Sequence, residues 1–390
     1  MRQTTWNQHI VKKKNKEIVL QAIIKLAPLS RAEIAQQSGL NKATVSSLVS
    51  ELIDEELIYE SGIGESSGGR RPVILLFNEQ AGYSLGVDIG VNYTLGVVTD
   101  LVGNVIYEVN QTVDTNLSSD QQIQLVIDTV HILIKHVPES RYGVIGIGIG
   151  VPGIVDNEGK VLLAPNLKWK DVDLLKILEA EFDYPILVEN EANAGAYGEK
   201  RFGAGQKSNN LIYISAGIGI GVGIILNGEL YRGINGFSGE SGHMTIVKNG
   251  RKCNCGSSGC WEAYASEHAL LKQAKEIDHL SEVSLGQLIE LANNNDKDAL
   301  KLFQEIGCNM STGITNLIKT FNPQLIIIGN RLAKAEKWIK QPIITTAKQE
   351  LLPFHKVDMN ITFSELSSYS AALGVSAFTI EEFLKIDHTE

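Results

Sequence analysis

The 390-residue sequence predicts an α/β protein with a small N-terminal head and a larger body of two similar lobes. A set of three short apolar strands occurs twice, first near residue 83 and again near residue 211, and further helices and strands follow each set. The first 80 residues show a different pattern, helical spacing followed by two strands. We therefore expect a head at 1–80, a first lobe at 81–200 and a second lobe at 201–390, the last with the dimerisation surface.

Charge divides the chain in the same way. Residues 1–50 sum to +6, from eight Lys and Arg against two Glu, so the net charge of −10 leaves −16 for the rest. A basic head on an acidic body predicts that the head meets a polyanion. The N-terminus lacks the apolar core of a signal peptide, and the apolar run 211–226 is too short to span a membrane. We expect a cytoplasmic protein without a membrane partner.

The head begins with a predicted helix from Asn7 to Ala27, ended by Pro28, whose lysines lie off the apolar face. That face is formed by Ile18, Val19, Ala22, Ile23 and Leu26. Ser30 and Glu33 form a capping box for a short helix, 31–38, and Gly39 breaks it. Asn41 then caps a third helix with the inward stripe Val45, Leu48, Val49, Leu52 and Ile53. This order of elements is the helix-turn-helix arrangement.

Two strands, Leu57–Glu60 and Pro72–Phe77, are predicted after the third helix, and the loop between them makes a wing. Small three-helix units also mediate protein contacts, but the basic charge and the wing favour double-stranded DNA. One recognition helix reads only half a site, so we expect a homodimer on a palindromic operator. The predicted DNA contacts are Lys42, Thr44, Ser46 and Ser47 on the third helix and Arg70 and Arg71 on the wing.

The body repeats one pattern of strands. The first triplet is Tyr83–Ile89, Thr94–Thr99 and Val105–Val109, and the second is Leu211–Ser215, Ile220–Leu226 and Glu229–Tyr231. Helices are predicted at Asp120–Lys135, Trp261–Lys275 and Ala299–Lys319, and buried strands at Val144–Ile149, Ile186–Glu189 and Leu325–Ile328. A duplicated three-strand meander followed by alternating helix and strand is typical of the actin-like ATPase fold, in which the ligand lies between the lobes.

Three of the four cysteines fall within eight residues, which indicates a reducing compartment and a metal rather than disulfides. His243, Cys253, Cys255 and Cys260 supply one imidazole and three thiolates, a set suited to a closed tetrahedral zinc, so the zinc is expected to be structural. Glu240 and Glu262 flank these ligands. The two carboxylates either join the histidine in binding a polyol or are merely solvated.

Several motifs together resemble the ROK family of repressors and sugar kinases, and within it the xylose-responsive repressors. They are Asp88-Ile-Gly, Gly150-Val-Pro-Gly, Pro165-Asn-Leu, Glu189-Asn-Glu-Ala-Asn, Ala216-Gly-Ile-Gly, Gly239-Glu-Ser-Gly-His and the cysteine stretch 253–262. The resemblance covers the chain from the head to the C-terminus. It implies sugar contacts at Gly153, Asn166, Asn190, Glu191, Glu240, His243 and Glu262.

The same resemblance argues against phosphoryl transfer. In the family's kinases an aspartate follows the sugar-binding asparagine and acts as general base, whereas this chain has Glu191, and an added methylene alters the reach of a base. Three phosphate-binding turns also differ, at Asp88-Ile-Gly-Val-Asn, Ser215-Ala-Gly and Gly329-Asn330. We expect no catalytic residue and no enzyme. The longer Glu191 is also expected to occupy the volume of a hexose C6 group and so to disfavour hexoses.

The sequence thus predicts a sugar-responsive transcriptional repressor with a winged helix-turn-helix head, an actin-like ROK body and a structural zinc loop. The effector is expected to be an aldopentose, D-xylose. Two other functions stay open at this point. One is an ATP-dependent sugar kinase with a DNA-binding head, and the other is a zinc-dependent DNA-binding protein without a small ligand.

Overall fold

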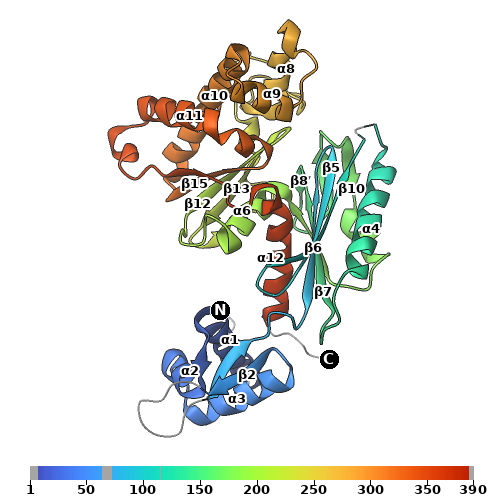
Figure 1. Cartoon of the computed structure of the whole chain (residues 1–390), viewed down its shortest axis with the longest axis vertical. Helices are drawn as coiled ribbons and strands as arrows, with labels where there is room; N and C mark the ends of the chain where they lie inside the picture. Colours follow the sequence, from blue (N-terminus) through green and yellow to red (C-terminus); the bar gives the residue numbers. More distant parts are fainter. Residues whose placement is uncertain (1–7, 64–72, 115, 386–390) are drawn as a thin grey trace.

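The computed structural model describes residues 8–63, 73–114 and 116–385. The head lies below a body of two lobes, and the helix α12 runs between the lobes towards the head (Figure 1). Over the described residues, none of the helices has the length and apolar character needed to cross a membrane.

In its described residues, the head has three helices and a small sheet with the strand order β1-β3-β2. Ser30 and Glu33 form the predicted capping box, and the side chain of Asn41 accepts the N–H of Thr44, as expected for an N-cap. The wing strands β2 and β3 pair antiparallel. The wing tip with Arg70 and Arg71 lies outside the described residues. The elements are α1 (Gln8–Leu26), β1 (Leu29–Ser30), α2 (Arg31–Ser38), α3 (Lys42–Asp54), β2 (Ile58–Ile63) and β3 (Val73–Phe77).

The buried face of α1 differs from the predicted one. Leu20 is fully buried beside Val19 and Ile23, whereas Ile18 and Leu26 are exposed. Lys16 is also buried on this face, 8% exposed, and its ammonium pairs with the carboxylate of Glu55. The prediction that the lysines avoid the apolar face was therefore wrong at this position, because a carboxylate from the end of α3 neutralises the buried charge.

The first lobe contains a five-stranded sheet with the order β11-β7-β4-β5-β6. Helix α4 covers one face of this sheet and α12 the other (Figure 1). A small sheet, β10-β9-β8, and the short helix α5 lie beside it. The elements are β4 (Tyr83–Ile89), β5 (Tyr93–Thr99), β6 (Val105–Thr112), α4 (Ser119–Lys135), β7 (Val144–Val151), β8 (Ile154–Val155), β9 (Val161–Ala164), β10 (Trp169–Val172), α5 (Leu174–Glu179) and β11 (Ile186–Asn190).

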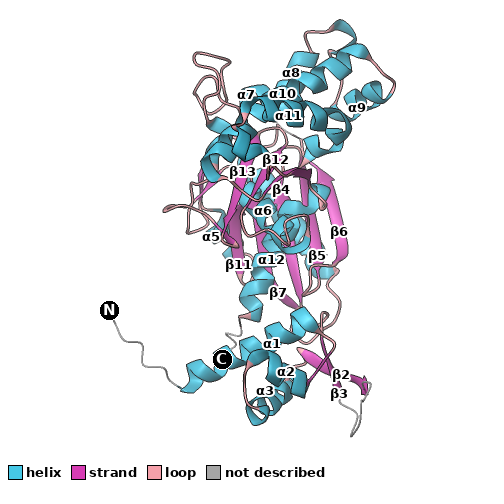
Figure 2. Ribbon diagram, turned by 90° about the vertical axis from the view of Figure 1, so that its left-hand side faces the viewer, coloured by secondary structure: helices cyan, strands magenta, loops and turns pink. Residues whose placement is uncertain are grey.

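The second lobe contains a sheet with the order β14-β13-β12-β15-β16, packed against α6 on one side and against a group of helices on the other (Figure 2). Its largest apolar cluster joins the sheet to α8, α9, α10 and α11. The elements are α6 (Glu191–Phe202), β12 (Leu211–Ala216), β13 (Ile220–Leu226), β14 (Glu229–Leu230), η1 (Glu240–His243), α7 (Glu262–Ala265), α8 (Glu267–Ala274), α9 (Leu285–Asn293), α10 (Lys297–Phe321), β15 (Leu325–Gly329), α11 (Glu336–Glu350) and β16 (Ile361–Phe363).

One predicted helix is two helices. The expected helix Trp261–Lys275 is interrupted at Ser266, which has extended backbone angles and accepts the N–H of Ala269 with its hydroxyl. This serine therefore acts as an N-cap and starts α8 in a new direction. The single-helix prediction was wrong because the apolar spacing continues across the break.

Helices α6 and α12 (Ser370–Leu384) cross between the two sheets. A Cβ on Gly374 would lie 1.7 Å from the carbonyl oxygen of Ala194, so the two backbones touch where they cross. Although α12 belongs by sequence to residues 201–390, it packs on β4 and β7 of the first lobe.

Candidate functional site

A cavity between the two lobes contains about 870 Å³ of space, including solvent at its mouth. Residues from both lobes line it. All seven residues predicted to contact a sugar belong to its lining: Gly153, Asn166, Asn190, Glu191, Glu240, His243 and Glu262. Fold and loop geometry thus bring together side chains that are up to about a hundred residues apart in the chain.

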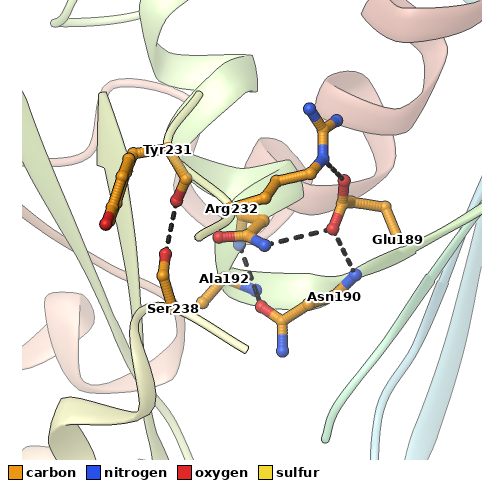
Figure 3. A network of polar contacts seen from close by, with 7 residues as sticks. Glu189, Asn190, Ala192, Tyr231, Arg232 and Ser238 are labelled. Atoms are coloured by element: carbon orange, nitrogen blue, oxygen red, sulfur yellow. Dashed lines mark hydrogen bonds and ion pairs between the residues drawn. The ribbon is translucent and has the colours of Figure 1, made fainter. Parts of the chain in front are cut away.

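Asn190 stands where β11 ends and α6 begins. Its side-chain oxygen accepts the N–H groups of Ala192 and Asn193 at 2.9 and 3.0 Å, which caps the helix (Figure 3). Its amide nitrogen donates to the carbonyl oxygen of Gly153 at 2.7 Å. Gly153 has φ 121°, and a Cβ there would meet the carbonyl oxygen of Leu163 at 2.4 Å, so glycine is required. The bond to Gly153 uses one of the two amide hydrogens, and the other N–H can donate to a ligand in the cavity.

Glu191, the next residue, is held by groups of the second lobe. Its two carboxylate oxygens lie 2.8 and 2.9 Å from the hydroxyl of Ser215, and Asn330 donates to it at 3.2 Å. Burial raises the pKa of Glu191, and the hydrogen bonds from Ser215 and Asn330 oppose that rise. Both donors come from turns that we predicted to have lost phosphate binding, so the carboxylate is turned towards that end of the cleft.

Asp88 lies behind Glu191 and is fully buried. Burial, together with the neighbouring carboxylate of Glu191, raises the pKa of Asp88 well above its usual range. The hydroxyl of Tyr93 donates to one oxygen of Asp88 at 2.7 Å, and the other oxygen has no hydrogen-bond partner among the described residues. Glu191 and Tyr93 line the cavity, and Asp88 lies buried beside them.

Four side chains form a candidate metal site: His243, Cys253, Cys255 and Cys260, whose ligand atoms all lie within 4.8 Å of one another. The sulfurs of Cys255 and Cys260 are 3.8 Å apart, and the sulfur of Cys253 lies 3.7 Å from Nδ1 of His243. Metal–sulfur bonds of ~2.3 Å in a tetrahedron give an edge of ~3.8 Å. Burial raises the pKa of the Cys253 thiol to about 12, so a thiolate there requires a cation nearby. The four residues fit a metal ion.

The metal cluster and the cavity share His243. Its Nδ1 faces the cysteines, whereas Nε2 faces the carboxylate of Glu240 at 3.9 Å. Glu262 uses one oxygen to accept the N–H of Ile220 at 2.9 Å. Burial raises the pKa of Glu240, with a smaller opposing effect from His243. One ring nitrogen and two carboxylates therefore converge on the cavity, as a ligand with several hydroxyl groups requires.

Asn166 brings the first lobe to the metal loop, because its side-chain oxygen accepts from the amide of Asn254 at 3.4 Å. Asn166 lines the cavity, so the turn after β9 reaches it.

Arg331 is a lining residue that the sequence did not reveal. Its guanidinium donates to Asn92 of the first lobe and pairs with Glu267 of the second lobe, both at 2.8 Å. Asn92 is separated from Arg331 by 239 residues, so no local pattern could have indicated the pair. The contact ties the two lobes together at the wall of the cavity.

In the head, the start of α3 presents Lys42, Ser46 and Ser47 to solvent, and Thr44 is half-buried because it also meets the cap of the helix. The opposite face packs Val45 and Leu48 into the head core. Three of the four predicted contact residues on this helix are therefore accessible, and Thr44 is partly accessible.

Residues 84–382 match the ROK family. The chain belongs to the ROK family. It is 46% identical over 382 residues to the xylose repressor of Bacillus spizizenii, an alignment that covers 97% of this chain and 98% of that protein. Because the family match begins at residue 84, the head precedes the ROK body.

Two solved structures resemble the fold. A ROK family transcriptional regulator, a homologue of the E. coli MLC protein, covers 96% of this chain and 98% of its own, with a TM-score of 0.81 and 26% identity. A ROK family glucokinase from Streptomyces griseus, in complex with glucose and AMPPNP, covers 76% of this chain and 99% of its own, with a TM-score of 0.71 and 29% identity. These matches bear out the predicted fold class of the ROK body.

Proposed function

We propose that this ROK protein is a sugar-responsive transcriptional repressor. Its head binds a palindromic operator as part of a homodimer, and an aldopentose, D-xylose, releases it. The observation that carries the proposal is that one chain combines an accessible helix α3 with a cleft lined by all seven predicted sugar contacts. The similarity to a xylose repressor over 97% of the chain supports the choice of sugar.

Five of the seven proposed sugar contacts have roles that follow from their hydrogen-bonding groups or their backbone. The carboxylates of Glu240 and Glu262 accept hydroxyl hydrogens, and the spare N–H of Asn190 donates to a sugar oxygen. Gly153 lets the backbone pack against Leu163 and accepts the amide of Asn190, and Asn166 adds an amide from the first lobe. Together they present donors and acceptors on several sides of a small polyol.

We assign DNA contacts to Lys42, Thr44, Ser46 and Ser47 on α3, and to Arg70 and Arg71 outside the described residues. Small polar side chains let the helix approach base edges, and lysine adds a phosphate or guanine contact. The proposed units remain the head, the first lobe and the second lobe, with α12 crossing back to the first lobe.

We also assign zinc to His243, Cys253, Cys255 and Cys260, in a structural role. Four soft ligands leave no open position for water, and a zinc on Nδ1 fixes the proton of His243 on Nε2, where it faces the cavity. Metal analysis of the purified protein tests the assignment, with one zinc per chain as the expected result.

A mobility-shift titration of a palindromic operator, with and without xylose and in parallel with glucose, tests the main proposal. Xylose is expected to weaken the operator complex, and glucose to do so less or not at all. An operator complex that saturating xylose leaves unchanged would overturn the proposal.

A second candidate function, a sugar kinase carrying a DNA-binding head, is favoured by the likeness to the Streptomyces griseus glucokinase. Against it stand Glu191 in place of the kinase aspartate and the pairing of Ser215 and Asn330 with that residue. Kinase activity requires such turns to offer donors to phosphate. A coupled assay for ADP with several sugars distinguishes the two functions, and we expect no turnover above background.

A further inference from the structure

Arg232 connects the two lobes at the back of the sugar motif. It follows β14 in the second lobe, and its Nε donates to the carboxylate of Glu189, in the first lobe, at 2.8 Å (Figure 3). The carboxylate of Glu189 is almost entirely buried, whereas the side chain of Arg232 is 40% exposed. Within the described part of the chain, Arg232 supplies the one cation paired with this buried charge.

The other oxygen of Glu189 holds the sugar motif itself. It accepts the backbone N–H of Asn190 at 2.9 Å and the side-chain amide of Asn193 at 3.1 Å. Asn190 in turn caps α6 and reaches Gly153. A movement of Arg232 that shifts the carboxylate of Glu189 therefore also shifts Asn190, which lines the cavity.

The same guanidinium also contacts α12. Its carbon lies 5.2 Å from the ring centre of Phe378. Phe378 stacks on Tyr197 of α6, with 4.0 Å between ring centres and an angle of 10°, and the hydroxyl of Tyr197 donates to Glu381 on α12. Arg232 thus touches both the sugar motif and the middle of the helix that runs to the head.

The far end of α12 is fixed to the head. Ile380 and Leu384 share an apolar cluster with Leu20 and other head residues. The ring of Phe383 meets Tyr142 edge-on at 4.9 Å, and the hydroxyl of Tyr142 donates to the carbonyl oxygen of Glu55 at 3.0 Å. Glu55 is the C-cap of α3, the helix we assign to DNA.

We propose that Arg232 is the positioning residue that transmits sugar occupancy to the head, by holding the sugar motif through Glu189 and α12 through Phe378 at the same time. The inference rests on the proposed function. Sugar contacts on both lobes change the position of β14 relative to β11, and Arg232 spans that gap. Its flat guanidinium then moves against Phe378, and the shared core passes the shift from α12 to the C-terminal end of α3.

The test measures sugar affinity and sugar response separately in the full-length protein. The coupling factor is the operator Kd at saturating xylose divided by the operator Kd without sugar, obtained by fluorescence anisotropy. Wild-type protein is expected to give a factor of roughly 5 to 150, the usual range for coupled sites. Arg232→Gln is expected to bring the factor below about 3, even at xylose concentrations that saturate the variant.

Arg232→Lys keeps the positive charge beside the buried Glu189, so it is the variant to use if Arg232→Gln fails to fold. An ammonium pairs with Glu189 but lacks the planar face that lies over Phe378, so we expect xylose Kd to stay within about threefold of wild type while the coupling factor still falls. Arg201→Gln is the matched control. Arg201 and Arg232 both line a second cavity, beside Phe378 of α12. Arg201 lies 6.0 Å from the ring centre of Tyr197 and has no carboxylate partner in the described residues. Its coupling factor is expected to match wild type.

Full release of operator from Arg232→Lys at saturating xylose would overturn the inference, as would an equal loss of coupling in Arg201→Gln. Either result would leave the proposed function standing, because wild-type protein would still respond. If wild-type protein itself gave a coupling factor of 1, the proposed function would fail first.

Discussion

Asn190 allows the sugar site and the stability of the fold to be separated by substitution. Its side chain makes three hydrogen bonds, two that cap α6 and one to the carbonyl of Gly153. Asn190→Ala removes all three. Loss of an N-cap costs about 1 kcal/mol, and loss of the bond to Gly153 costs about another 1 kcal/mol. We therefore expect Asn190→Ala to lower the free energy of unfolding by about 2 kcal/mol and to weaken xylose binding by at least about tenfold.

Asn190→Ser is the matched control, because a serine hydroxyl caps α6 but cannot reach Gly153 or replace the amide donor. It is expected to recover about half of the lost stability and little of the lost xylose affinity. Urea unfolding gives the free energies, and isothermal titration calorimetry gives xylose Kd. Wild-type xylose affinity in the serine variant, or unchanged stability in the alanine variant, would refute the reasoning.

Three further predictions follow from the cleft and the metal loop. Chelation of the metal, or Cys260→Ser, is expected to lower the melting temperature by about 5 °C or more and to weaken xylose binding; calorimetry with and without added zinc checks this, and an unchanged melt contradicts it. Glu191→Asp is expected to improve glucose binding relative to xylose, and an unchanged ratio of the two Kd values rules out crowding by Glu191. Because burial raises the pKa of Asp88 above its unfolded value, that carboxyl destabilises the fold as the pH rises from about 4 towards neutral. Asp88→Asn should therefore gain stability relative to wild type as the pH rises. A difference in melting temperature between variant and wild type that is the same at acidic and neutral pH would contradict it.

Local signals in the sequence predicted the head and the strands closely. The capping pair Ser30 and Glu33 defines the start of α2, and the predicted bounds Tyr83–Ile89 and Ile220–Leu226 match β4 and β13. These elements depend on neighbours in the sequence, such as cap residues, or on apolar runs bounded by turn residues. Such features can be recognised without knowing what packs against them.

Helices α6 and α12 escaped prediction for a physical reason. Helix α12 is buried on nearly all sides, between the first sheet and α6, so its apolar and small residues form no single stripe. The close crossing at Gly374 requires small residues rather than a repeating apolar spacing.

The candidate site divides in the same way. The His and Cys cluster could be predicted because its spacing is short, and the residues that line the cavity could be named because their motifs resemble a family. Arg232 and Arg331 were not, since each pairs with a residue of the other lobe. An arginine that bridges two lobes has no partner nearby in the chain, and only the folded arrangement reveals it.

The contacts of Arg331 and Asn330 also bear on how a fold shared with kinases can serve a repressor. Phosphoryl transfer requires donors that are free to meet phosphate when the cleft closes. Here Arg331 is already bound to Asn92 and Glu267, and Asn330 already donates to Glu191. Donors that would serve a nucleotide instead tie one lobe to the other, so a sugar that changes the distance between the lobes must rearrange these ties. The free energy of sugar binding is then available for moving the head rather than for stabilising a transition state.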